Sequence, residues 1–413
     1  MILDFPVINK TFDFLDNYDL FMMPNGIYKA RQIEAPNYLY PMYFLKENGE
    51  YRVSTSVYAL IHYKKRFIRN PRFQTTHFYR PSFLTIDKEI RRVRTTFRRS
   101  TFELTDKKEI IHLGANLIQE YVTEIEQKYP GWIHVLSMGG KDSQNIILTK
   151  RSEKWIVLSG EPNASLNRKF IQDNKIDIER FMSVSNATDN TFLLEEIVAS
   201  DCLFDIAHFR WSKQLYNLNK EYNGKVVFWM GTNGDGVFKR NNNHGDQDYY
   251  AVHDLHVGTA MGVLHQVFKN FLNIPVVSPY QSPPFLDKLF YRFNPYFVDN
   301  AGDVRAEIGE LLFGRTVLYP DQNPTPEPWK RDRALSIPLY VGRLQKEGVF
   351  CKKRSFQSLT YGTQEKIFYY LDQNSQKRRG NVSKILFPAR KKLAQFFPIF
   401  RNKRHDIAST EIK

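Results

Sequence analysis

The sequence predicts an α/β protein whose main sheet is parallel, and three observations lead to that prediction. Short apolar segments alternate with amphipathic segments from about residue 110 onward. These short segments are almost continuously apolar, as strands buried on both faces are. A glycine-containing turn directly follows the first of them. Before about residue 105 the pattern differs, because apolar and polar residues alternate there as in half-buried strands.

The elements follow from these patterns in chain order. An apolar and aromatic run at 38–45 and an alternating segment at 51–57 flank a Glu-Asn-Gly-Glu turn, which predicts a hairpin in a β-rich first region. Apolar residues then recur at helical spacing over 110–125. Strands are predicted at 133–136, 155–158, 181–184 and 225–230, helices at 165–174 and 191–219, and a mainly helical part beyond about 270.

Composition and charge limit the possible classes of protein. The chain has 413 residues, enough for two domains with cores of their own. Its two cysteines do not indicate a disulfide framework. It shows neither a run of about 20 apolar residues nor a secretory signal pattern, so we expect a cytoplasmic protein. The net charge is +15, and ten Lys or Arg without any acid lie between Lys377 and Arg404.

The turn after the strand at 133–136 is the strongest chemical signal. Backbone amides and the start of the following helix converge there, which favours an anion. Glycines let the backbone approach a phosphate closely. Asp142 can hold Mg2+ against phosphate oxygens, and Ser143 can donate a hydroxyl to them. The turn reads Ser137, Met138, Gly139, Gly140, Lys141, Asp142 and Ser143.

This turn resembles the Ser-Gly-Gly-x-Asp-Ser loop of the N-type ATP pyrophosphatases, or PP-loop proteins, with Met138 in place of the first serine. Two further segments are similar to asparagine synthetase-like proteins, whose relatives include β-lactam synthetase and the lasso-peptide cyclases. Residues 230–238 resemble Gly-Glu-Gly-x-Asp-Glu-Leu-Phe through Gly231, Gly234, Asp235 and Phe238. Residues 282–287 resemble Arg-Val-Pro-Phe-Leu-Asp.

The resemblance implies a PP-loop ATP pyrophosphatase domain over 109–350 with a helical C-terminal part. A smaller α+β domain over 1–108, a degenerate Ntn-like glutaminase, would precede it, and a helical extension with a basic tail over 351–413 would follow. Asp142 and Asp235 would hold Mg2+, and Lys330 would act with Asp142 in adenylation. The expected ATP contacts are Ser137, Gly139, Gly140, Lys141, Asp142, Ser143, Ser159, Gly231 and Thr232.

Two departures from that family change the expected reaction. The second residue is Ile2, where a glutamine-using member needs a cysteine nucleophile, so the first domain should lack glutaminase activity. Thr232 stands where asparagine synthetase has a glutamate and β-lactam synthetase a tyrosine, and threonine is no base near neutral pH. The general base must therefore come from elsewhere, or the amine must arrive deprotonated.

The leading expectation is an AMP-forming amide synthetase that adenylates a small-molecule or peptide carboxylate and transfers it to an amine. An amidotransferase fed by a separate glutaminase or by ammonia, in glycan or natural-product biosynthesis, is one alternative. A non-catalytic ATP-binding scaffold is another.

Other charged groups favour plainer interpretations. The histidines at 244, 253, 256 and 265, with nearby aspartates, could bind zinc, but surface or substrate-loop histidines are favoured. The arginines within 91–99 are best explained as a solvated strand face. The basic tail is expected to be solvated, with peripheral contact to a membrane on its cytoplasmic face as the next interpretation and nucleic acid disfavoured.

Overall fold

The fold is that of a computed structural model. It describes residues 6–16, 23, 26–35, 43–47, 50–54, 59, 74–75, 82–86, 93–97, 101, 103–160, 163–184, 211–232, 234–238, 269, 272–293 and 304–320. These residues include the turn that follows the first predicted parallel strand and the two segments similar to asparagine synthetase-like proteins, except Asn233 and the side chain of Asp235.

The first part of the chain forms a sheet of its own in the order β5-β3-β4-β2-β6-β7, with β1 paired to β2. The pairs are antiparallel except β1–β2. The predicted hairpin is confirmed, because Glu47 lies opposite Glu50 across the turn. The strands are β1 (Val7–Asp16), β2 (Ile27–Ala35), β3 (Tyr43–Glu47), β4 (Glu50–Ser54), β5 (Gln74–Thr75), β6 (Ser82–Ile86) and β7 (Val93–Phe97).

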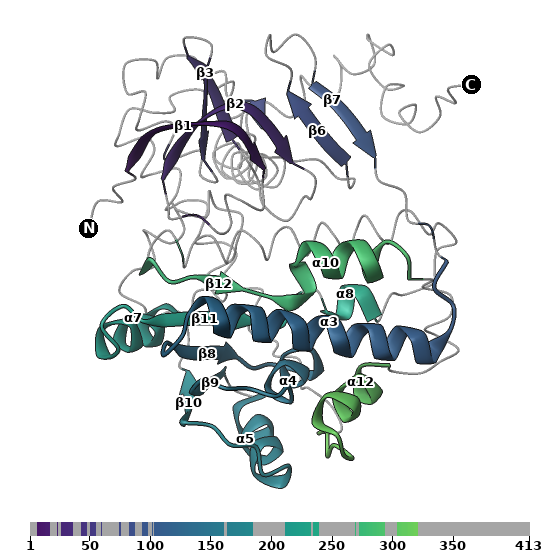
Figure 1. Cartoon of the computed structure of the whole chain (residues 1–413). Coiled ribbons are helices and arrows are strands. Elements are labelled where there is room, and N and C mark those ends of the chain that lie inside the picture. Colours follow the sequence, from purple (N-terminus) through teal and green to yellow (C-terminus); the bar gives the residue numbers. More distant parts are fainter. Residues whose placement is uncertain are drawn as a thin grey trace, which may run out of the picture. The chain divides into compact units, whose positions relative to one another are not determined.

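The second sheet is the predicted parallel one, and it confirms the α/β class. Its order is β10-β9-β8-β11-β12, and every neighbouring pair is parallel. The strand β8 is therefore central (Figure 1). The strands are β8 (Ile133–Ser137), β9 (Trp155–Gly160), β10 (Arg180–Val184), β11 (Val226–Met230) and β12 (Val276–Val277).

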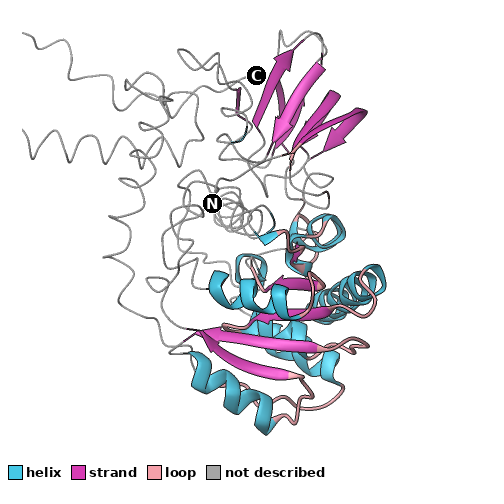
Figure 2. Cartoon of the chain, turned by 90° about the vertical axis from the view of Figure 1, so that its left-hand side faces the viewer, coloured by secondary structure: helices cyan, strands magenta, loops and turns pink. Residues whose placement is uncertain are grey.

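Helices cover the strands on both sides, as Figure 2 shows. The helix α3 (Lys107–Lys128) begins at Asp106, whose carboxylate accepts from the Glu109 N–H at 2.8 Å. Its apolar face packs in one core cluster with Leu136, Val157 and Trp229. The intervening strand residues are equally buried and serve the opposite face, which explains why the strand segments are continuously apolar.

The remaining helical segments lie between and after the parallel strands. They are α4 (Lys141–Ile147), α5 (Asn163–Asp173), α7 (Ser212–Glu221), α8 (Gly234–Phe238), η4 (Pro279–Gln281), α10 (Pro283–Phe285), η5 (Leu286–Phe290) and α12 (Val304–Phe313). The predicted helix at 191–219 is confirmed only in its last part, because 185–210 lies outside the described residues. Among the described helices, none is long and apolar enough to span a bilayer.

Candidate nucleotide site

The glycine-containing loop follows β8, the strand at which the strand order of the parallel sheet reverses. The chain proceeds from β8 to β9 and β10 on one side, whereas β11 lies on the other side of β8. Ser137 and Met230, the last residues of β8 and β11, are register partners. The segments after these two strands therefore leave the sheet at the same level and side by side. Ligands of open α/β sheets bind at such a switch point.

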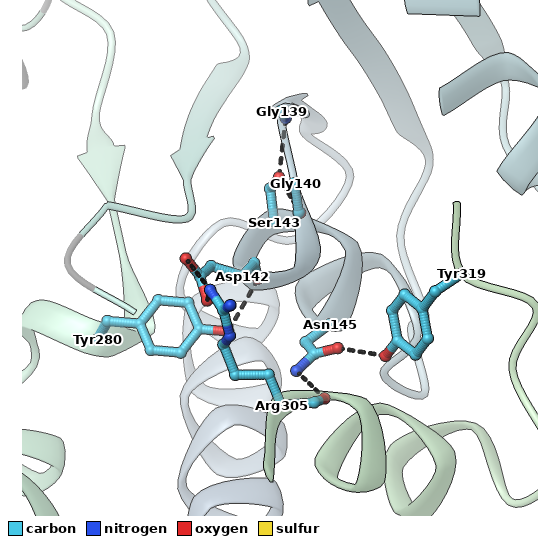
Figure 3. Close-up of polar contacts among 8 residues, drawn as sticks. All are labelled: Gly139, Gly140, Asp142, Ser143, Asn145, Tyr280, Arg305 and Tyr319. Atoms are coloured by element: carbon cyan, nitrogen blue, oxygen red, sulfur yellow. Dashed lines mark hydrogen bonds and ion pairs between the residues drawn. The ribbon is translucent and has the colours of Figure 1, made fainter. Parts of the chain in front are cut away.

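Inside the loop, short hydrogen bonds fix the turn from strand to helix. Gly140 is the N-cap residue of α4. The Gly139 N–H donates to Ser143 Oγ, and that hydroxyl donates to the Gly140 carbonyl, both at 2.9 Å. In this structure the Ser143 hydroxyl thus stabilises the loop itself (Figure 3).

Buried polar side chains support the loop from below. Ser159 Oγ donates to the Met138 carbonyl at 2.8 Å. Asn167 Nδ2 donates to the carbonyls of Met138 and Gly139, at 2.9 and 3.2 Å, and to Ser159 Oγ. Gln144 Nε2 in turn donates to Asn167 Oδ1 at 2.9 Å. Ser159 is fully buried, so it supports the loop here, and its expected contact with ATP stays a prediction.

The second motif packs directly on the first. A Cβ atom added to Gly231 would lie 2.5 Å from the Ser143 amide nitrogen, and one added to Gly234 would lie 2.5 Å from Asp142 Cγ. At Gly231 the neighbouring atoms belong to the main chain, so the close approach there requires glycine. Gly234, the residue before Asp235, thus lies against the Asp142 carboxylate. The side chain of Asp235 lies outside the described residues, so the shared metal site stays a prediction.

The third motif reaches the loop through an aromatic residue just before it. Tyr280 is buried, and its hydroxyl donates to the Asp142 carbonyl at 2.8 Å. Burial raises the pKa of Tyr280 well above its ordinary value, and the charge of Asp142 adds to this effect, so the hydroxyl remains a donor. Phe285 packs edge-on against Tyr280 and Phe238, which joins the second and third motifs.

An arginine that the sequence did not single out completes the described site. Arg305 Nη1 lies 3.1 and 3.4 Å from the two carboxylate oxygens of Asp142. Asn145 Nδ2 donates to the Arg305 carbonyl, and the Tyr319 hydroxyl donates to Asn145 Oδ1. Figure 3 shows this group around the start of α4. An arginine on a late helix gives no sequence signal of such a contact, because most arginines are solvated.

The remaining predicted residues are placed as follows. Lys141 begins α4, and its Nζ lies 5.8 Å from the ring centre of Tyr319. The Thr232 carbonyl accepts from Ser278 Oγ at 3.2 Å. Lys330, the four histidines and the basic tail lie outside the described residues, and so do the side chains of the arginine cluster. Among the described residues, the site included, no three His, Cys, Asp or Glu side chains form a metal-binding group.

A nucleotide and a magnesium ion fit the groups that are described. A Cβ atom added to Gly139 would meet nothing within 4 Å, so open space lies over the loop where a phosphate would approach. Mg2+ usually takes one or two carboxylates and completes its shell with phosphate oxygens and water. Asp142, two residues after the loop glycines, offers such a carboxylate, which faces Arg305 (Figure 3). The residues present therefore suit a magnesium–polyphosphate pair.

Comparison with known proteins adds little to this geometry. No protein-family model matches the chain, and a search of curated proteins finds no relative. Among solved structures, the crystal structure of NAD+ synthetase from Burkholderia pseudomallei is similar over 61% of this chain and 93% of that chain. The identity is 11% and the TM-score is 0.21, a likeness too weak to bear on fold or function.

Proposed function

We propose that this chain is an ATP-dependent, AMP-forming amide synthetase. The observation that supports the proposal best is that the loop, the second motif and the residue Tyr280 just before the third motif meet at Asp142 and Ser143. Gly231 and Gly234 contact these two residues directly, and the segment of the third motif reaches Asp142 through Tyr280.

The proposed reaction has two steps. A carboxylate oxygen of the substrate attacks the α-phosphorus of ATP, and the bond to the bridging oxygen breaks, so pyrophosphate leaves. An amine then attacks the carbonyl carbon of the adenylate, loses a proton to a base, and AMP departs. Loop amides and Lys141 would bind the polyphosphate, Asp142 would hold Mg2+ together with Asp235, and Lys330 would stabilise charge on the α-phosphate. Bound magnesium would neutralise the leaving pyrophosphate.

The substrates belong to the proposal in class only. The acid would be a small molecule or a peptide, and the amine would come from the substrate itself, from ammonia or from a separate glutaminase. Ile2 supports the view that the first region supplies no ammonia of its own. We place the enzyme in the cytoplasm, with its basic tail available to an anionic membrane surface.

A loop substitution tests the nucleotide site separately from the fold. Gly139→Ala should leave the unfolding free energy within about 1 kcal/mol, because its Cβ meets no atom of the described residues within 4 Å. The same methyl group should weaken ATP binding at least about tenfold if a phosphate occupies that space. Isothermal calorimetry with ATP and urea denaturation measure the two effects. If Gly139→Ala binds ATP as tightly as the wild type, the phosphates of ATP do not bind at this loop.

The chemistry requires its own assay. We expect ATP–pyrophosphate exchange that depends on one of a panel of carboxylates, and loss of that exchange in Asp142→Ala. Glu124→Gln, an exposed change on α3, is the control and should exchange normally. ADP formation instead of AMP would contradict the proposal.

A second candidate function is nucleotide binding without turnover. Two observations favour it: Thr232 follows β11 at the place where a base is expected, and Asp142 is already paired with Arg305. Tight ATP binding with no pyrophosphate exchange for any carboxylate would support this alternative.

A further inference from the structure

We propose that Arg305 competes with magnesium for the Asp142 carboxylate and gives up part of this contact when the metal binds. This inference rests on the proposed function, because it concerns the same carboxylate. The side chains are 10% and 16% exposed, and Nη1 reaches both oxygens at 3.1 and 3.4 Å. A carboxylate so far removed from water is costly without a nearby positive charge.

The helix α4 holds Arg305 at two points. Asp142 contacts its side chain, and Asn145, three residues later on the same face of α4, donates to its carbonyl at 2.9 Å. The Tyr319 hydroxyl donates to Asn145 Oδ1 at 2.7 Å, which orients the amide group so that Nδ2 faces Arg305. The main chain of Arg305 is thereby fixed, whereas the guanidinium lies at the end of a long side chain.

A guanidinium and an inner-sphere magnesium compete for the oxygens of this carboxylate, because both are cations and Arg305 Nη1 reaches both oxygens. Magnesium binds carboxylate oxygens at about 2.0–2.1 Å and tolerates little distortion. With Nη1 at 3.1 Å from Oδ1, the metal would lie against a group of the same charge. Binding of the metal should therefore weaken the contact between the guanidinium and Asp142, and phosphate oxygens of the nucleotide are suitable new partners for the guanidinium.

The competition between Arg305 and the metal can be tested by titrating the full chain with Mn2+ alone. The electron paramagnetic resonance signal of free Mn2+ measures how much of the metal is bound. Arg305→Gln should bind Mn2+ at least about fivefold more tightly than the wild type, equal to about 1 kcal/mol. Arg305→Lys retains a competing cation and should stay near the wild type. Adding Asp142→Asn to Arg305→Gln should abolish the gain, because the gain belongs to that carboxylate.

The outcomes separate this inference from the proposed function. If an Arg305→Gln protein with a normal melting curve binds Mn2+ equally well or more weakly than the wild type, Arg305 does not compete with the metal and the inference is wrong. If Arg305→Gln does not fold, Arg305→Ala and the single Asp142→Asn variant provide the same comparison. If Asp142→Asn leaves wild-type Mn2+ binding unchanged, Asp142 binds no metal and the inference is wrong. Tighter Mn2+ binding in Arg305→Gln, with no ATP–pyrophosphate exchange in the wild type, would support the competition between Arg305 and the metal. The same result would count against the proposed synthetase activity.

Discussion

Two glycines just after β11 allow the second motif to pack closely on the loop, because neither has a side chain. Gly231 lies against main-chain atoms of Ser143, and Gly234 lies against the Asp142 carboxylate. Main-chain atoms cannot rotate away as the end of a side chain can, so the two positions differ in how well they should tolerate a methyl group.

We expect Gly231→Ala to destabilise the protein by roughly 1–3 kcal/mol, because its Cβ would lie 2.5 Å from the Ser143 amide nitrogen. Urea denaturation measures the change. Gly139→Ala is the matched control from the same site, since its Cβ meets no atom of the described residues within 4 Å. Equal stability of the two variants would show that the segment after β11 does not pack on the loop as described.

At this scale the sequence predicted the glycines and Asp142 but not their partners. Gly139, Gly231 and Asp142 lie in local motifs that can be recognised without a structure. Arg305 is 163 residues from Asp142, and no local pattern connects residues that only folding brings together. Asn167 was missed for the same reason, because an asparagine inside an amphipathic helix usually faces water.

Among the helices and strands, α5 has a second task besides covering the sheet. Asn167 of this helix donates to the carbonyls of Met138 and Gly139, and these hydrogen bonds fix the position of the loop. The helix itself was predicted from its apolar spacing. Its connection to the loop depends on the side-chain amide of Asn167. The hydrogen bonds of this amide leave no trace in the pattern of apolar residues, so the sequence did not predict them.

Replacing Asn167 by alanine should cost about 2–3 kcal/mol and also weaken ATP binding, because buried polar groups of the loop lose their partner. Asn174→Ala is the matched control. Asn174 is also buried, but its amide donates to the carbonyls of Phe170 and Leu318 instead of the loop. The control should lose stability without a change in ATP affinity. Denaturation curves and calorimetry with ATP distinguish the two variants.

For the whole molecule, the buried imidazole of His134 makes stability depend on pH. His134 Nδ1 accepts from Trp229 Nε1 at 2.8 Å, and its ring stacks on Trp155. Burial lowers the pKa of His134 from 6.5 to about 4, against a smaller opposing effect of Glu126. The unfolded chain therefore binds a proton at a higher pH than the folded chain does.

Stability should accordingly fall as the pH drops from about 6.5 toward 4, because protonation favours the unfolded state in that window. Between pH 7 and pH 5 the loss should be about 2 kcal/mol. Urea denaturation followed by tryptophan fluorescence measures it, since Trp155 and Trp229 flank the imidazole. His134→Gln has no titrating group there and should lose this part of the pH dependence, whatever its absolute stability.

The whole fold could be predicted in its class because the alternation of strands and helices is a local signal. Continuous apolar runs predicted the four strands that form most of the parallel sheet. The two-residue strand β12 was not predicted, because Val276 and Val277 are too few to show a period. The sheet order was also open, since it depends on pairing between β8 and β11, which are far apart in the chain.

The dependence of α4 on α12 has a consequence for biosynthesis. A ribosome makes the loop first and Arg305 163 residues later, so Asp142 emerges long before the guanidinium that will neutralise it. Until the segment up to Tyr319 has been translated, Asn145 also lacks the hydroxyl that orients its amide. The contacts around the start of α4 therefore become complete only when that late helix docks.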